Sequence, residues 1–161
     1  MSMPSIRPLT IKTKGETLPI KLFRWITAIR QWELLENWHY VYQGHEYVIP
    51  KGFVFDGASI PRLLWFLLSP TGLLLIPGLI HDYGYRYQYL WEVDKDSPTG
   101  YKKSLEMHNH KAWDKLFHEV SKEVNEMAII SGLAYVALWV FGGFAWESNR
   151  RKSAEGLYPW E

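Results

Sequence analysis

The stretch "LIPGLIHDYGYRYQ", residues 75–88, places a His-Asp pair, tyrosines and an arginine at the end of a long apolar run. Such a run predicts a helix from about Leu73 to about Leu90. Pro77 falls near its first turns, where a helix tolerates proline. Ionisable side chains in a helix that should bury Leu and Ile indicate either a functional site or a buried, hydrogen-bonded link between elements.

Two helices together predict a buried general base. His81 and Tyr85 are four residues apart and therefore lie one turn apart on one helix face, while Asp82 points about 100° round from His81. A second helix, expected over 104–124, carries Asp114 beside an apolar stripe in "HKAWDKLFHEV". If the two helices pack antiparallel, Asp114 meets His81 and Tyr85. A histidine oriented by a buried carboxylate is a competent general base.

The turn sequence "DGASIPR" adds Asp56 and Gly57, and it must pack near the first helix. The carboxylates of Asp56 and Asp82, together with turn carbonyls, form an oxygen-rich site of the kind that Ca²⁺ prefers. A hard cation there would polarise a carbonyl and stabilise the oxyanion formed when water attacks it. With His81 as the general base, these carboxylates and the cation would form the active site of a hydrolase. The structural alternative is that His81 and Asp82 only hydrogen-bond the helices to this turn.

Composition narrows the classes of function. The chain has 161 residues, which favours a single domain over 1–161. The absence of Cys excludes disulfides, thiolate metal sites and Cys nucleophiles. A formal net charge of +1, without a basic stripe, argues against a nucleic-acid partner. The 9 Trp, 10 Tyr and 7 Phe indicate either a well-packed core or an interfacial surface.

The expected fold class is α+β. Residues 1–55 are rich in strand-forming side chains and contain the turn signals "QG" and "PKG", which predict an N-terminal antiparallel β meander. Residues 56–147 predict a helical core of three helices, two of them an antiparallel pair that carries the His-Asp and Asp motifs. Residues 148–161 are polar and predict an exposed tail.

The third expected helix, over 126–147, contains an uncharged run, Met127–Trp146, that is about long enough to span a bilayer. This run is either a central core helix or a segment that spans or lies in a membrane interface. The N-terminus lacks the basic and apolar regions of a signal peptide. If the protein leaves the cell, we expect it to do so by lysis or as part of a particle.

The blocks "FDGASIPR", "HDYGYR" and "WDKLFHEV" occur in this order and resemble the calcium-dependent phospholipase A2 superfamily, most closely its short prokaryotic and fungal branch. This likeness covers roughly Phe55 to Val120. It implies calcium-dependent hydrolysis of a phospholipid or another acyl ester at a membrane surface. The same blocks, after "VIPKGF", also resemble an uncharacterised domain family common in tailed phages and prophages. That second likeness covers most of the chain and implies a phage protein in the host cytoplasm or the virion, with virion proteins as partners.

The phospholipase likeness implies a role for six residues. His81 matches the general base that activates water, and Asp114 matches the carboxylate that orients it. Tyr85 matches the tyrosine that hydrogen-bonds this carboxylate. The calcium-binding residues that the likeness implies are Asp82, Asp56 and Gly57.

Secreted phospholipases of this type are stabilised by disulfide bonds. This chain differs from them because it has no Cys. The β region and the third helix would supply the stability instead. Two other functions stay open. One is a non-catalytic accessory piece of a phage tail or virion that keeps the phospholipase-like scaffold. The other is a hydrolase with a transition metal, for which His110 and Asp114, four residues apart, permit a metal pair.

Overall fold

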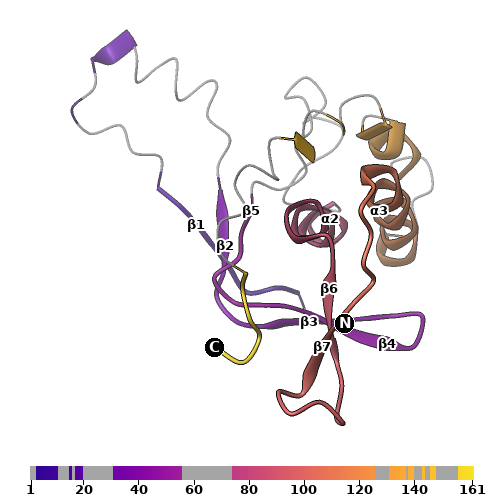
Figure 1. Ribbon diagram of the computed structural model, residues 1–161. Coiled ribbons are helices and arrows are strands. Elements are labelled where there is room, and N and C mark those ends of the chain that lie inside the picture. Colours follow the sequence, from indigo (N-terminus) through magenta and orange to yellow (C-terminus); the bar gives the residue numbers. More distant parts are fainter. Residues whose placement is uncertain are drawn as a thin grey trace.

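The computed structural model describes residues 3–10, 15, 17–19, 31–55, 74–125, 131–136, 138–139, 143, 146–147 and 156–161. Within these residues the fold is α+β: two antiparallel sheets accompany the helices α2 and α3 (Figure 1). The smaller sheet has the strand order β1-β2-β5, formed by Ile6–Pro8, Trp32–Leu34 and Val54–Phe55.

The larger sheet has four strands in the order β3-β4-β6-β7, and each neighbouring pair is antiparallel. Its strands are Trp38–Tyr42, His45–Ile49, Leu90–Val93 and Tyr101–Ser104. The predicted turn between the first two strands is confirmed, because Gln43 and Gly44 both adopt positive φ angles of 51° and 83°. This is the backbone that a two-residue hairpin loop requires.

Strand β3 alternates buried and exposed residues and turns an aromatic face toward the helices. Trp38, Tyr40 and Tyr42 are buried and stack on one another along this face. The Tyr40 hydroxyl donates to Glu123 at 3.1 Å, and the Tyr42 hydroxyl donates to Glu119 at 2.5 Å. Since both glutamates lie on α3, the sheet and this helix are joined by polar as well as apolar contacts.

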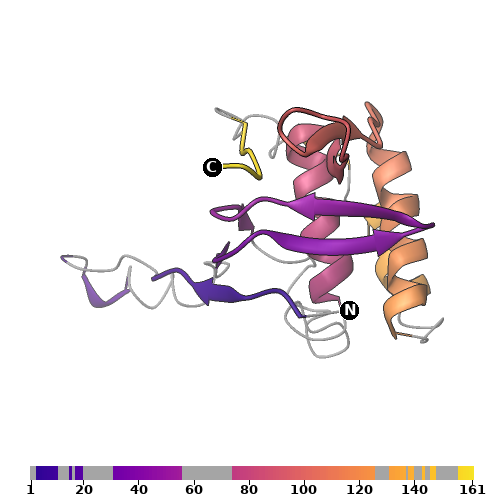
Figure 2. The ribbon, with the colours of Figure 1, turned by 90° about the horizontal axis from the view of Figure 1, so that it is seen from below.

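Helices α2 (Leu75–Tyr87) and α3 (His110–Asn125) run side by side across strands β3 and β4 (Figure 2). Every residue of α2 from Leu75 to Tyr85 is buried, so this helix is enclosed on all sides, as a central helix with apolar residues all round must be. The helices approach closely at Gly84, where an added Cβ would lie 2.1 Å from the ring of Trp113.

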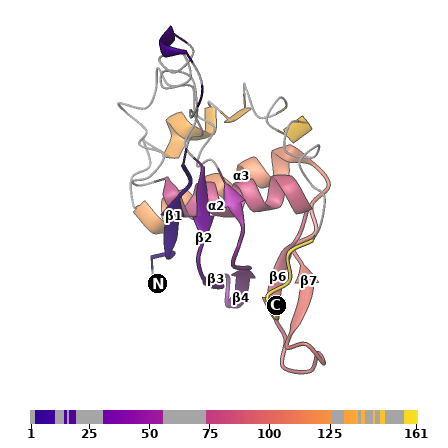
Figure 3. The same cartoon turned by 90° about the vertical axis from the view of Figure 1, so that its left-hand side faces the viewer.

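The predicted order of a meander followed by three helices is wrong. Along the chain, strands β6 and β7 come between α2 and α3 and form a hairpin that projects away from the helices (Figure 3), and the strands make two sheets instead of one. The first helix ends at Tyr87 because Gln88 adopts a left-handed φ of 67° and its N–H bonds to the Gly84 carbonyl. The predicted third helix lies only partly within the described residues, and its described residues, 131–136, 138–139, 143 and 146–147, are all helical.

The last six residues, 156–161, belong to the predicted exposed tail and contact the larger sheet, while Tyr158, Trp160 and Glu161 are exposed. The Trp91 indole donates to the Leu157 carbonyl at 2.9 Å, and the rings of Trp91 and Trp160 meet at 5.1 Å. The Asn37 side chain also donates to the Pro159 carbonyl. Aromatic packing and backbone acceptors therefore hold this segment, despite the polar residues that precede it.

Within the described part of the chain, no helix is both long enough and apolar enough to cross a membrane. The uncharged run Met127–Trp146 is described only at 131–136, 138–139, 143 and 146. In those positions Ser131, Ala134 and Leu138 are buried, whereas Leu133, Val136 and Trp139 are exposed. This segment thus has one face against the protein and one apolar face toward the surroundings.

Substitution of Gly84 tests the close packing of the two helices. We expect Gly84→Ala to lower the free energy of unfolding by about 1–3 kcal/mol, because the new methyl group overlaps the buried Trp113 ring. Urea unfolding would measure the change. Gly132→Ala is the matched control, since a Cβ there meets nothing within 4 Å, and it should leave the stability unchanged or slightly higher. Equal effects of the two variants would contradict the packing.

Candidate active site

A buried histidine and a buried carboxylate join the two helices. The Nε2 atom of His81, on α2, lies 2.9 Å from Oδ1 of Asp114, on α3, and both side chains are almost completely shielded from solvent. An ionised carboxylate only accepts hydrogen bonds, so Nε2 carries the proton in this pair. The lone pair of the neutral imidazole is therefore on Nδ1.

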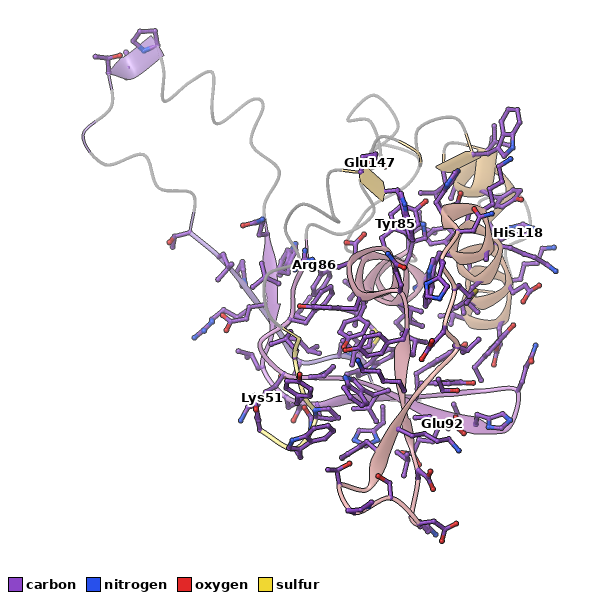
Figure 4. All side chains as sticks on the ribbon, in the orientation of Figure 1. Lys51, Tyr85, Arg86, Glu92, His118 and Glu147 are labelled. Carbon is purple, nitrogen blue, oxygen red and sulfur yellow. The ribbon has the colours of Figure 1, made fainter. Side chains whose placement is uncertain are left out.

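The same carboxylate oxygen also accepts a hydrogen bond from the hydroxyl of Tyr85, one helical turn after His81. The rings of His81 and Tyr85 are in contact, with 3.9 Å between their centroids, and Phe117 of α3 packs edge-on against the imidazole at 5.5 Å. Figure 4 shows Tyr85 on the flank of α2 that faces α3, with Arg86 on the opposite flank. These contacts hold the imidazole in one orientation.

Asp82 places a second buried carboxylate on the other side of the imidazole. Its Oδ1 lies 3.9 Å from Nδ1 of His81, and its side chain is as well shielded as that of His81. The two ring nitrogens therefore face different carboxylates. Nε2 is hydrogen-bonded to Asp114, while Nδ1 is directed to the region beside Asp82, where a water molecule would have to be activated.

Burial and charge act in opposite directions on this site. Burial disfavours the imidazolium, but the hydrogen bond to Asp114 and the nearby charges of Asp82 and Asp114 outweigh it and raise the pKa of His81 above 6.5. Burial, followed by the hydrogen bond to Asp114, also raises the pKa of Tyr85. Tyr85 therefore stays a neutral donor, and His81 is a stronger base than a free imidazole.

Four of the six residues singled out in the sequence meet here: His81, Asp82, Tyr85 and Asp114. The other two, Asp56 and Gly57, lie outside the described residues. The side chain that the sequence argument missed is Trp146, whose ring packs edge-on against Tyr85 at 5.1 Å. No spacing rule links residues 85 and 146, so only the tertiary structure brings them together.

The donor set suits a hard cation only in part. Asp82 supplies the oxygen ligands that Ca²⁺ prefers, but Ca²⁺ takes six to eight of them. Among the described residues no group of three or more His, Asp or Glu side chains forms a metal centre, so further oxygens would come from other residues or water. The proposed metal pair of His110 and Asp114 would have to use Asp114 Oδ2, because Oδ1 already accepts hydrogen bonds from both α2 side chains.

Comparison with protein families places this site inside a recognised domain. Residues 32–138 match the family described as a protein of unknown function, DUF1353. The chain belongs to this family. The matched range runs from β2 to beyond α3, so it includes His81, Asp82, Tyr85 and Asp114, whereas Trp146 lies beyond it. No curated protein and no solved structure matches the chain.

Replacement of Asp114 tests the electrostatics of the site. We expect Asp114→Asn to lower the pKa of His81, because the neutral amide no longer stabilises the imidazolium. An NMR titration of the imidazole resonances would measure this pKa. Glu123→Gln is the matched control, since it neutralises another hydrogen-bonded carboxylate of α3, the partner of Tyr40, and should leave His81 unaffected. An unchanged pKa in Asp114→Asn would refute the pairing.

Proposed function

We propose that this chain is a calcium-dependent lipid esterase with a phospholipase A2-like mechanism, in which His81 activates the water that attacks an ester carbonyl. The observation that carries this proposal is the orientation of one imidazole. Its Nε2 is bound to Asp114, which Tyr85 also contacts, while its Nδ1 is directed to the side of Asp82. This arrangement agrees with the roles that the phospholipase likeness implies for the same residues.

The chain's own residues account for both proton transfers. Nδ1 of His81 removes a proton from water as the water oxygen bonds to the ester carbonyl carbon. Asp114 holds the Nε2 proton and stabilises the imidazolium, and Tyr85 holds Asp114 in place. When the tetrahedral intermediate collapses, the bond from carbon to the alcohol oxygen breaks. His81 then returns its proton to that oxygen, which releases a fatty acid and an alcohol.

The calcium ion, when bound, would polarise the ester carbonyl and stabilise its oxyanion. Asp82 is the described residue that would hold it, and the phospholipase likeness adds Asp56 and Gly57. Asp82 lies next to the base in sequence and in space, so a substrate carbonyl near this carboxylate would also lie near the activated water. Removal of calcium should therefore abolish turnover without disturbing the hydrogen bond of His81 to Asp114.

The exposed apolar face of 131–139 supports a lipid as the substrate class. Leu133, Val136 and Trp139 recur every three residues, and the exposed fraction of Trp139 reaches 66%. Tryptophan at the edge of an apolar face suits the boundary between water and lipid. Trp146 ends the same uncharged run, Met127–Trp146, and its ring contacts Tyr85. The run that carries this apolar face therefore also contacts the site.

Fatty-acid release from vesicles of phosphatidylglycerol and phosphatidylcholine tests the proposal. We expect hydrolysis in calcium and none in EGTA. His81→Gln should reduce the rate by about 100-fold or more, because it removes the base. Tyr85→Phe should reduce it by about tenfold, because it removes one hydrogen bond to Asp114. Glu123→Gln, a control on α3 outside the site, should retain full activity.

Calcium titration calorimetry separates the ion from the catalytic base. Wild type and His81→Gln should both bind calcium, whereas Asp82→Asn should not. Hydrolysis that survives EGTA would contradict the calcium mechanism. A folded wild type that neither binds calcium nor hydrolyses lipid would contradict the esterase and favour the non-catalytic phage component, whose presence in purified virions would then be the deciding observation.

A further inference from the structure

A cavity lies on the other flank of α3. This cavity, of about 270 Å³, opens between the β3–β4 turn, the segment after β7 and the first half of α3. It is lined by Tyr42, Gln43, Leu105, Met107, Ala112, Lys115, Leu116 and Glu119. None of these side chains belongs to the His81–Asp114 site, so the cavity is separate from that site.

One wall of the cavity is apolar and the other is a chain of hydrogen bonds. Leu105, Met107, Ala112 and Leu116 make up the apolar wall. On the polar wall, the Gln43 amide donates to the Tyr42 hydroxyl at 3.0 Å, and this hydroxyl donates to Oε2 of Glu119 at 2.5 Å. The carboxylate is therefore held at a defined position beside an apolar surface.

The backbone beside the cavity contains a strained residue, Leu105. Leu105 has a φ of 48°, a left-handed conformation that costs a bulky residue about 1–2 kcal/mol. The positive φ of Gln43 is explained by its hairpin turn, and that of Gln88 by its helix cap, but Leu105 has neither role. Next to it, the Met107 N–H donates to the Gln88 carbonyl at 3.0 Å, and the Met107 carbonyl accepts from Trp113 at 2.8 Å. Strained residues held by their surroundings are typical of ligand sites.

The polar wall selects the chemistry of a ligand. Glu119 Oε2 accepts the hydrogen bond of Tyr42, while Oε1 lies 3.7 Å from the Lys115 ammonium, beyond hydrogen-bond distance. The side chain of Lys115 is 74% exposed and that of Glu119 is 41% exposed, so the carboxylate is the better fixed of the two charges. A fixed acceptor beside an apolar wall favours a ligand that has a hydrogen-bond donor at one end.

We propose that this cavity binds a compact amphiphile, with an apolar ring system against Leu105, Met107 and Leu116 and an amine or hydroxyl head that donates to Glu119. The volume exceeds the roughly 150 Å³ that accommodates benzene, which suits a two-ring aromatic body. The site is independent of lipid hydrolysis.

Tryptamine is a suitable probe because it combines an indole with an amine. In an NMR titration of the full chain, we expect saturable shifts at the amides of Leu105, Met107 and Ala112. Ala112→Leu should weaken binding about tenfold or more by filling the cavity, and Lys111→Leu, the exposed neighbour outside the lining, should not. Glu119→Gln should weaken tryptamine binding by about tenfold, the value of one charge-assisted hydrogen bond.

Two comparisons make this proposal refutable. Indole-3-acetate has the same rings with an acidic head, so it should bind about tenfold more weakly than tryptamine. His81→Gln should bind tryptamine as the wild type does, which separates this site from the esterase. The proposal is overturned by a folded wild type without saturable shifts, by equal binding in Ala112→Leu, or by preference for the acidic probe.

Discussion

The buried carboxylate of Asp114 is the constraint on which the helical half of this protein depends. A charge removed from water destabilises the fold by several kcal/mol unless hydrogen bonds replace its hydration. Here two donors from successive turns of α2, His81 and Tyr85, converge on one oxygen of that carboxylate. A shift of α2 against α3 would move both donors away from this oxygen, and the other oxygen, Oδ2, is buried without a hydrogen-bond partner among the described residues. The interaction that sets the packing is therefore also the one that orients the candidate base.

The apolar packing on α3 agrees with this register. Gly84 leaves room for the Trp113 ring one residue before Asp114, and Phe117 reaches the imidazole one turn later. The outer flank of the same helix is tied to the sheet through Tyr42 and Glu119, beside the cavity. Contacts therefore hold both flanks of α3, and the two proposed sites lie on this helix without sharing a side chain.

The sequence predicts the local parts of this structure and misses those that depend on distant partners. The spacing of His81 and Tyr85, with Asp114 on a second helix, is a local pattern, and the structure brings all three together. The β6–β7 hairpin was missed because the segment around Gln88 lacks glycine and proline, so nothing marks the end of α2. The division into two sheets depends on which strands pair, and alternation along one strand does not encode its partner. Asp56 and Gly57 stay predictions.

The tautomer of neutral His81 tests the central claim most directly, because it does not depend on substrate, metal or assay. Long-range ¹⁵N–¹H NMR correlations, recorded at a pH above the pKa of His81, distinguish the two ring nitrogens. The hydrogen bond to Asp114 predicts a proton on Nε2 and an unprotonated Nδ1, which is the form that can accept a proton from water. A proton on Nδ1 would contradict both the pairing with Asp114 and the role of His81 as the base.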